Sequence, residues 1–183
     1  MSQIYVAIDL ETTGLDPESD RIIEVGAVRF DDAGNELAVL EQVVNPGREI
    51  PPFIERFTGV TNDMVRDAPT LADLEPTLRE FVGSARVVGH NIGFDLHYLG
   101  REGLSLGASA VDTAELARYL LPTLRSHSLA EVSADLGIEP AIQHRALSDA
   151  RTAARVFCGL LTRAEALAPE RRWQLARFIA VNQ

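Results

Sequence analysis

The sequence predicts a single α/β domain with a mixed β-sheet at its centre. Its 183 residues suffice for one domain with one sizeable hydrophobic core. Strand-like stretches follow one another directly near the N-terminus, whereas strand-like and helix-like stretches alternate afterwards. A leading β-meander followed by alternating strands and helices is typical of an α/β domain whose sheet has both antiparallel and parallel neighbours.

Five stretches are rich in β-branched and other apolar residues, as buried strands are. The expected strands cover residues 4–10, 21–30, 36–45, 85–90 and 109–112. The turn sequence DAGN separates the second strand from the third, which favours a meander. The stretch PGREIPP (46–52) contains three prolines and is expected to be irregular.

Helical spacing of apolar residues accounts for most of the remaining chain. The expected helices cover residues 70–83, 94–103, 113–121, 128–136, 146–162 and 167–180. Thr70 is the expected N-cap of the first of these helices, in which Pro76 is a local misfit. No internal repeat or linker interrupts the sequence, so residues 1–183 are expected to form one domain. The last helix is assigned no role.

The formal net charge of −10 is the reverse of what a nucleic-acid-binding domain usually carries. The charge is also uneven, since residues 1–100 carry −11 and residues 101–183 carry +1. An acidic N-terminal part suits either the binding of cations or a solvated acidic surface.

The chain is expected to act in the cytoplasm. Its single cysteine, Cys158, lies in an apolar helical stretch and cannot form an internal disulfide, which suits a reducing compartment. No apolar run approaches the roughly 20 residues of a membrane span. The N-terminus begins directly in a strand pattern, so neither a signal peptide nor membrane association is expected.

Two carboxylates stand at the C-terminal end of the first expected strand, in the stretch VAIDLETTGLD (6–16). Side chains alternate between the two faces of a strand, so Asp9 and Glu11 project from the same face. Two adjacent buried carboxylates repel each other unless a proton, a basic group or a cation relieves them. No basic residue lies near them in sequence, and carboxylate oxygens suit Mg²⁺ or Mn²⁺. The pair therefore indicates a metal site, although acids also commonly rim a sheet without one.

Two further segments carry candidate residues. VVGHNIGFD leads from a short strand through a loop into a helix at Asp95, where an aspartate is commonly an N-cap. In QHRALSDARTAARVF, Asp149 lies in the first turns of a long helix and His144 lies five residues earlier. Five residues turn an ideal helix by about 140°, so the two share a face only if His144 lies on the incoming loop. Taken singly, each of these residues also has an ordinary structural explanation.

Taken together, the three segments resemble the motifs of the DnaQ-like, or DEDDh, 3′–5′ exonuclease family. The matching stretches are AIDLETTGL, GHNIGFDLHYL and HRALSDA, the last with the family's H-x₄-D spacing. These motifs carry five key residues: Asp9, Glu11, Asp95, His144 and Asp149. The flanking stretches IIEVGAV, FTGVTNDMV and HSLAEVSADLGI are also similar, so the resemblance covers about residues 4–160.

The resemblance implies a ribonuclease H-like fold, with a central mixed five-stranded sheet flanked by helices. It implies two divalent cations, Mg²⁺ or Mn²⁺, of which Asp9, Glu11 and Asp149 ligate one and Asp9 also contacts the second. Asp95 contacts the second ion largely through water, and His144 is the general base. Four carboxylates balance two divalent cations, so a loaded site no longer repels a phosphate, and two ions about 3.5–4 Å apart suit phosphodiester hydrolysis.

The same resemblance implies a set of residues that contact the terminal nucleotide and its free 3′-OH. They are Glu11, Thr12 through its backbone, Phe57, Gly59, Val60, Asn91, Phe94 and His144. Phe57 and Phe94 could equally be core residues, and Gly59 an ordinary turn residue.

The predicted function is a metal-dependent 3′–5′ exonuclease that releases nucleoside 5′-monophosphates from single-stranded or frayed DNA 3′ ends, in proofreading or DNA repair. One alternative is a 3′–5′ exoribonuclease acting on RNA tails or short oligonucleotides. Another is a nonenzymatic module that binds a polymerase, a helicase or a nucleic-acid end, but the presence of all four acids and the histidine argues against it. The acidic composition predicts distributive cleavage, with a polymerase or helicase partner or fused domain supplying processivity. The sequence indicates no oligomeric state.

Overall fold

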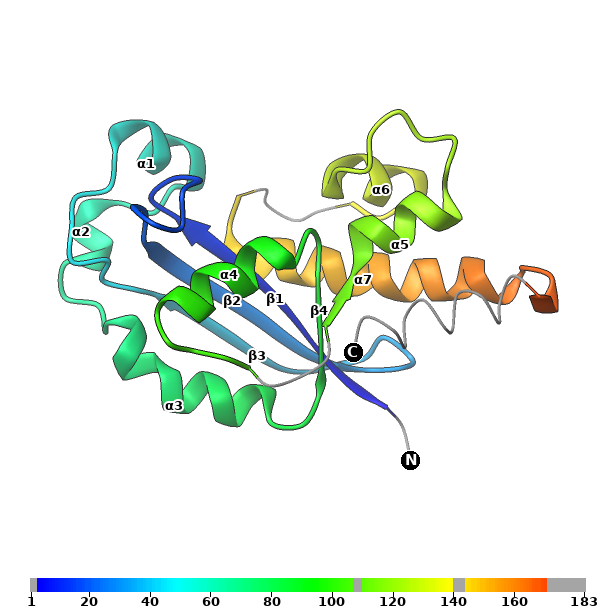
Figure 1. Cartoon of the computed structure of the whole chain (residues 1–183), viewed down its shortest axis with the longest axis horizontal. Coiled ribbons are helices and arrows are strands. Elements are labelled where there is room, and N and C mark those ends of the chain that lie inside the picture. Colours follow the sequence, from blue (N-terminus) through cyan, green and yellow to red (C-terminus); the bar gives the residue numbers. More distant parts are fainter. Residues whose placement is uncertain (1–2, 107–109, 140–143, 171–183) are drawn as a thin grey trace.

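The computed structural model describes residues 3–106, 110–139 and 144–170 (Figure 1). Within these ranges, five strands form one sheet in the order β3-β2-β1-β4-β5. The strands are β1 (Ile4–Thr12), β2 (Ile22–Asp31), β3 (Glu36–Val43), β4 (Arg86–Gly89) and β5 (Ala110–Asp112). The first three are antiparallel neighbours, whereas β4 runs parallel to β1 and β5 runs parallel to β4. The predicted mixed five-stranded sheet is confirmed.

Helices cover both faces of this sheet (Figure 1). In chain order they are α1 (Pro52–Thr58), α2 (Asn62–Val65), α3 (Leu71–Val82), α4 (Gly93–Arg101), α5 (Thr113–Leu120), α6 (Leu129–Asp135) and α7 (Ala146–Glu165). On one face, α5, α6 and α7 pack against Tyr5 and Ala7 of β1. On the other face, α3 and α4 pack against Val6 and Ile8. The alternation of β1 therefore decides which of its side chains meet α7.

The helices α1 and α2 were not expected from the sequence. Helix α1 begins at Pro52, at the end of a stretch expected to be irregular, because a proline fits the first helical turn, where its missing N–H is not needed. Both helices cover a small apolar cluster that contains Ile23, Ile50, Val60 and Val65. Helices of 7 and 4 residues show too little apolar periodicity to be read from a sequence.

The other expected elements agree with the structure to within a few residues. Thr70 caps α3 in a reciprocal capping box with Asp73, and Pro76 lies inside that helix. Cys158 is half-buried and packs against the core under α7, as expected. Residues 171–180 of the expected C-terminal helix lie outside the described ranges. Across the described part of the chain, no helix is long and apolar enough to cross a membrane.

Candidate active site

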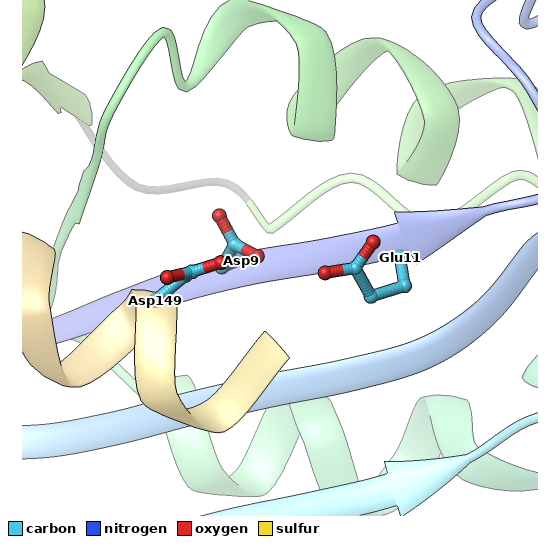
Figure 2. A group of neighbouring side chains, drawn as sticks. All are labelled: Asp9, Glu11 and Asp149. Atoms are coloured by element: carbon cyan, nitrogen blue, oxygen red, sulfur yellow. The ribbon is translucent and has the colours of Figure 1, made fainter. Parts of the chain in front are cut away.

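Three carboxylates meet where β1 passes beside the start of α7. Asp9 and Glu11 come from β1, and Asp149 reaches toward them from the first turns of α7 (Figure 2). Ligand oxygens of the three side chains all lie within 4.8 Å of one another. This spacing is small enough for one cation to contact all three.

The alternation of β1 explains why two acids point at the helix. Tyr5, Ala7, Asp9 and Glu11 lie in one row along the strand, and the first two are buried in the core against α7. Helix α7 begins beside the second half of this row, since the backbone of Ala146 and Leu147 lies against Gly26, the β2 partner of Asp9. The row changes from apolar to acidic at the point where the helix begins.

Asp95 lies on α4, outside the group formed by Asp9, Glu11 and Asp149. Its Oδ1 accepts a hydrogen bond of 3.0 Å from the backbone N–H of Leu10. Strand β4 pairs with β1 only between Tyr5 and Ala7, so Asp95 supplies a partner to the β1 backbone where the ladder has ended. The alternative explanation of Asp95 as an N-cap is wrong, because Ile92 holds that position of α4.

Burial raises the pKa of all four carboxyl groups. The pKa of Glu11 is raised to about 8, because the group is buried and lies near the charges of Asp149 and Glu24. The pKa of Asp95 is raised to about 7 by burial, against the opposing effect of the backbone N–H groups that it accepts from. Burial, followed by the charge of Asp95, holds the pKa of Asp9 well above its ordinary value. Burial also raises the pKa of Asp149.

His144 lies on the loop that enters α7, one residue before the N-cap Arg145, which is the position that lets it share a face with Asp149. Its backbone N–H donates a hydrogen bond of 3.0 Å to Oδ2 of Asp149. Its φ of 59° lies in the left-handed region, which a non-glycine residue rarely adopts. The imidazole ring stacks on Phe57 of α1, with ring centroids 3.9 Å apart and planes inclined by 33°. The candidate base is therefore held from both its backbone and its ring.

The two candidate pocket phenylalanines have different surroundings. The side chain of Phe57 is 47% exposed, contacts His144 and stacks on Phe53, with centroids 5.9 Å apart. Phe94 is partly buried and packs on Tyr98 in the core under α3 and α4. Phe57 thus lies beside the loop that leads into α7, whereas Phe94 packs mainly within the core.

The remaining candidate substrate residues are Thr12, Gly59, Val60 and Asn91. Gly59 ends α1 in a left-handed conformation, with φ of 76°, and Val60 is 0% exposed in the small cluster under α1 and α2. The Thr12 hydroxyl donates to the carbonyl of Gly14. Asn91 is exposed, has a φ of 58°, and donates its backbone N–H to Asp112 at 3.0 Å.

Two charged residues at the edge of the site are not among those predicted from the sequence. Glu24 of β2 stands opposite Glu11 in the β1–β2 register and is 0% exposed. Arg145 lies between His144 and α7 and binds Glu24 through its guanidinium, with a shortest distance of 2.6 Å. The available signals were a glutamate inside the apolar run IIEVGAV and an arginine next to His144.

Sequence comparison relates this chain to nucleases. The RNase_T family model, described as Exonuclease, matches residues 6–157. The DNA polymerase III subunit epsilon of Aquifex aeolicus is 36% identical over 162 residues, which cover 86% of this chain and 80% of the relative. The DNA polymerase III PolC-type protein of Clostridium perfringens is 37% identical over 157 residues, or 84% of this chain. This chain spans only 11% of the length of that relative.

Solved structures with the same fold are also nucleases. Exonuclease X, in complex with 5′ overhanging duplex DNA, superposes with a TM-score of 0.76 at 27% identity, covering 90% of this chain and 95% of its own. The nuclease domain of 3′hExo, a DEDDh family member bound to rAMP, gives a TM-score of 0.76. At 19% identity, with 88% of this chain and 92% of that chain covered, the second match speaks for the fold alone. The ribonuclease H-like fold expected from the motifs is confirmed.

Proposed function

The chain belongs to the RNase_T exonuclease family, and on this basis we propose that it is a metal-dependent 3′–5′ exonuclease that releases nucleoside 5′-monophosphates from DNA 3′ ends. One observation carries the proposal. Asp9 and Glu11 from one end of the sequence meet Asp149 from the other, and the backbone of His144 is bonded to that same Asp149. A cluster of acids with an adjacent histidine suits phosphodiester hydrolysis.

The donor set fits divalent cations, and we propose that two Mg²⁺ or Mn²⁺ ions bind here. Asp9, Glu11 and Asp149 offer oxygen ligands, which hard cations prefer, and Asp95 adds a fourth carboxylate from α4. Burial, together with mutual repulsion of the charges, raises the pKa of each group, and bound cations would favour the ionised carboxylates. When bound, such cations relieve the negative charge that develops on the phosphate and on the leaving oxygen.

His144 is the proposed general base. Histidine changes its protonation state near neutral pH, so its imidazole can accept the proton of the attacking water. The backbone hydrogen bond to Asp149 and the contact of the ring with Phe57 support this role, because they hold His144 next to a carboxylate of the cluster. The residue is half-buried, which leaves part of it open to water.

Phe57 is the proposed stacking surface for the terminal base. Its exposed ring lies beside His144, and Phe53, which is 63% exposed, extends the aromatic surface. Aromatic rings bind single-stranded bases by stacking, largely without regard to sequence. Glu11, the Thr12 backbone, Gly59, Asn91 and Phe94 remain proposed contacts. Because Val60 is enclosed, its contact would come from the backbone.

DNA is the proposed substrate, and replication the proposed setting. The relatives named above are DNA polymerase III subunits or polymerases that contain the matched segment as a small part of their length. We therefore propose proofreading or repair of single-stranded or frayed 3′ ends in the cytoplasm, with a polymerase as partner or as part of the same protein. Alone, this acidic domain should release DNA after each cut.

The proposal can be tested with end-labelled oligonucleotides. DNA and RNA oligomers of one sequence, labelled at the 5′ end, are incubated with the protein and Mg²⁺, Mn²⁺ or EDTA. We expect shortening from the 3′ end with either metal and none with EDTA, faster on DNA than on RNA. D9N should abolish shortening, whereas E36Q, which alters an acid on the exposed strand β3, should not. Full activity of D9N would contradict the proposed site, and faster loss of RNA would favour the exoribonuclease.

A further inference from the structure

Strand β2 holds the start of α7 through a fully buried glutamate. The carboxylate of Glu24 accepts hydrogen bonds from Nε of Arg145 at 3.1 and 3.2 Å and from its terminal nitrogen at 2.6 Å. It also accepts the backbone N–H of Ala146, the first residue of α7, at 3.0 Å. Arg145 reaches on to Glu41 of β3 at 3.2 Å. One buried side chain thus satisfies a free N–H of the helix and fixes the arginine before it.

A glycine on the same face of β2 lets the helix approach this closely. A Cβ placed on Gly26 would lie 2.1 Å from the carbonyl carbon of Ala146 and 2.2 Å from the backbone nitrogen of Leu147. Such contacts are impossible for any other residue, so the backbone of the first turn rests directly on the strand. Glu24 thus holds this turn through its hydrogen bonds, and Gly26 lets the backbone of the turn pack directly against β2.

The held segment lies between His144, on the loop that precedes α7, and Asp149, in the first turns of α7. His144 comes immediately before Arg145 and has the unfavourable φ of 59°. Asp149 follows within the first turns and is bonded to the backbone of His144. A residue held in a strained backbone conformation needs support from its surroundings. Glu24 and Arg145 supply that support without belonging to the three-carboxylate group.

We propose, on the basis of the active site proposed above, that Glu24 and Arg145 are positioning residues for the reaction. They place the His144 imidazole and the Asp149 carboxylate relative to Asp9 and Glu11, and they touch neither substrate nor cation. Glu24 is buried and Arg145 is 31% exposed, and an ion pair of this kind is weak evidence for stability, since replacing both charges is often neutral. Placement of the two residues, rather than stability, is therefore the role of the pair.

A double substitution separates placement from stability. E24Q/R145M removes both charges together, and E36Q/R151M is the matched control, because Arg151 of α7 bonds Glu36 of β3 through two bonds of 2.9 Å. We expect kcat of E24Q/R145M on single-stranded DNA to fall on the order of 10- to 100-fold, as for residues that orient an active site, with KM changed less than about twofold. The control should keep both values. A kcat of E24Q/R145M within about twofold of the unaltered protein would overturn the proposal.

An NMR measurement reports the placement without activity. The ring protons of His144 lie over Phe57 and should be shifted by its ring current, and H144Q identifies their signals among the four histidines. In E24Q/R145M these signals should move toward those of a free imidazole, while thermal melting and the other histidine signals show that the protein is folded. Unmoved signals in a folded protein would also overturn the proposal. If E24Q/R145M does not fold, R145K, which keeps the charge of a half-exposed side chain, is measured in the same way. Activity retained in D9N would instead refute the proposed function.

Discussion

Replacing Glu11 by glutamine should stabilise the metal-free protein at alkaline pH, although it removes a side chain from the active site. In the folded protein the pKa of Glu11 is raised to about 8 from an ordinary value of 4.5. Between these values the folded state binds more protons than the unfolded state, so stability falls as the pH rises through this window and is lowest above it. A neutral amide at position 11 removes this penalty.

The size of the effect follows from the shift. A pKa raised from 4.5 to about 8 corresponds to about 5 kcal/mol lost when the group ionises, if Glu11 acts alone. Its neighbours share the protons, so the gain on substitution is smaller, on the order of a few kcal/mol. At roughly 2–4 °C per kcal/mol for a chain of this size, E11Q should melt roughly 5–15 °C higher in EDTA at about pH 9. At about pH 5 the difference should nearly vanish.

Metal should narrow this difference in melting temperature. A cation present at 100 times its dissociation constant stabilises the folded state by about 2.7 kcal/mol. E11Q lacks one of the three carboxylates that would bind the cation, so metal should stabilise E11Q less than the unaltered protein. Thermal melts followed by circular dichroism, with EDTA or with millimolar Mn²⁺, measure both effects. E36Q is the control: Glu36 has its pKa lowered by Arg151, so its loss should destabilise at any metal concentration. If E11Q melts below the unaltered protein in EDTA at about pH 9, burial and repulsion do not make the ionised Glu11 carboxylate destabilising.

Three further substitutions test other parts of the site. H144Q should lower kcat by about 10²- to 10⁴-fold, yet Mn²⁺ should still raise its melting temperature. Loss of this stabilisation by Mn²⁺ would mean that His144 is a metal ligand instead. F57A should raise KM for single-stranded DNA by about fivefold, which is equivalent to about 1 kcal/mol of base stacking. It should change the free energy of unfolding in urea little, because Phe57 is 47% exposed. An unchanged KM would exclude Phe57 from the pocket. G26A should lower the urea unfolding free energy by about 1–3 kcal/mol through overpacking against Ala146, and an unaltered value would mean that α7 can retreat freely from β2.

The local part of the site could be predicted from the sequence. The shared face of Asp9 and Glu11 follows from the alternation of any strand, and the place of His144 ahead of α7 follows from helical geometry. The mixed sheet followed from a meander succeeded by alternating elements. The first two features depend on neighbours within a few residues, and the class of sheet follows from the order of strands and helices along the chain.

The short helices and the contacts of Asp95 could not be predicted in this way. Helices α1 and α2 are stabilised by packing over Ile23 and Ile50 rather than by a periodicity of their own. Asp95 was open to interpretation as an N-cap because nothing in its own segment reveals that β4 stops pairing with β1 at Ala7. Its partner, the N–H of Leu10, lies 85 positions away in the chain.

The sequence by itself determined which chemical groups this protein has and how they are arranged along each strand and helix. Only the tertiary structure brought Asp149 to Asp9 and Glu11 and placed the buried Glu24 where it holds Arg145 and the start of α7. The physical reason is that burial and repulsion arise from neighbours in space. A carboxylate's raised pKa depends on the charges and apolar groups packed around it, and these come from β1, β2, α4 and α7 together.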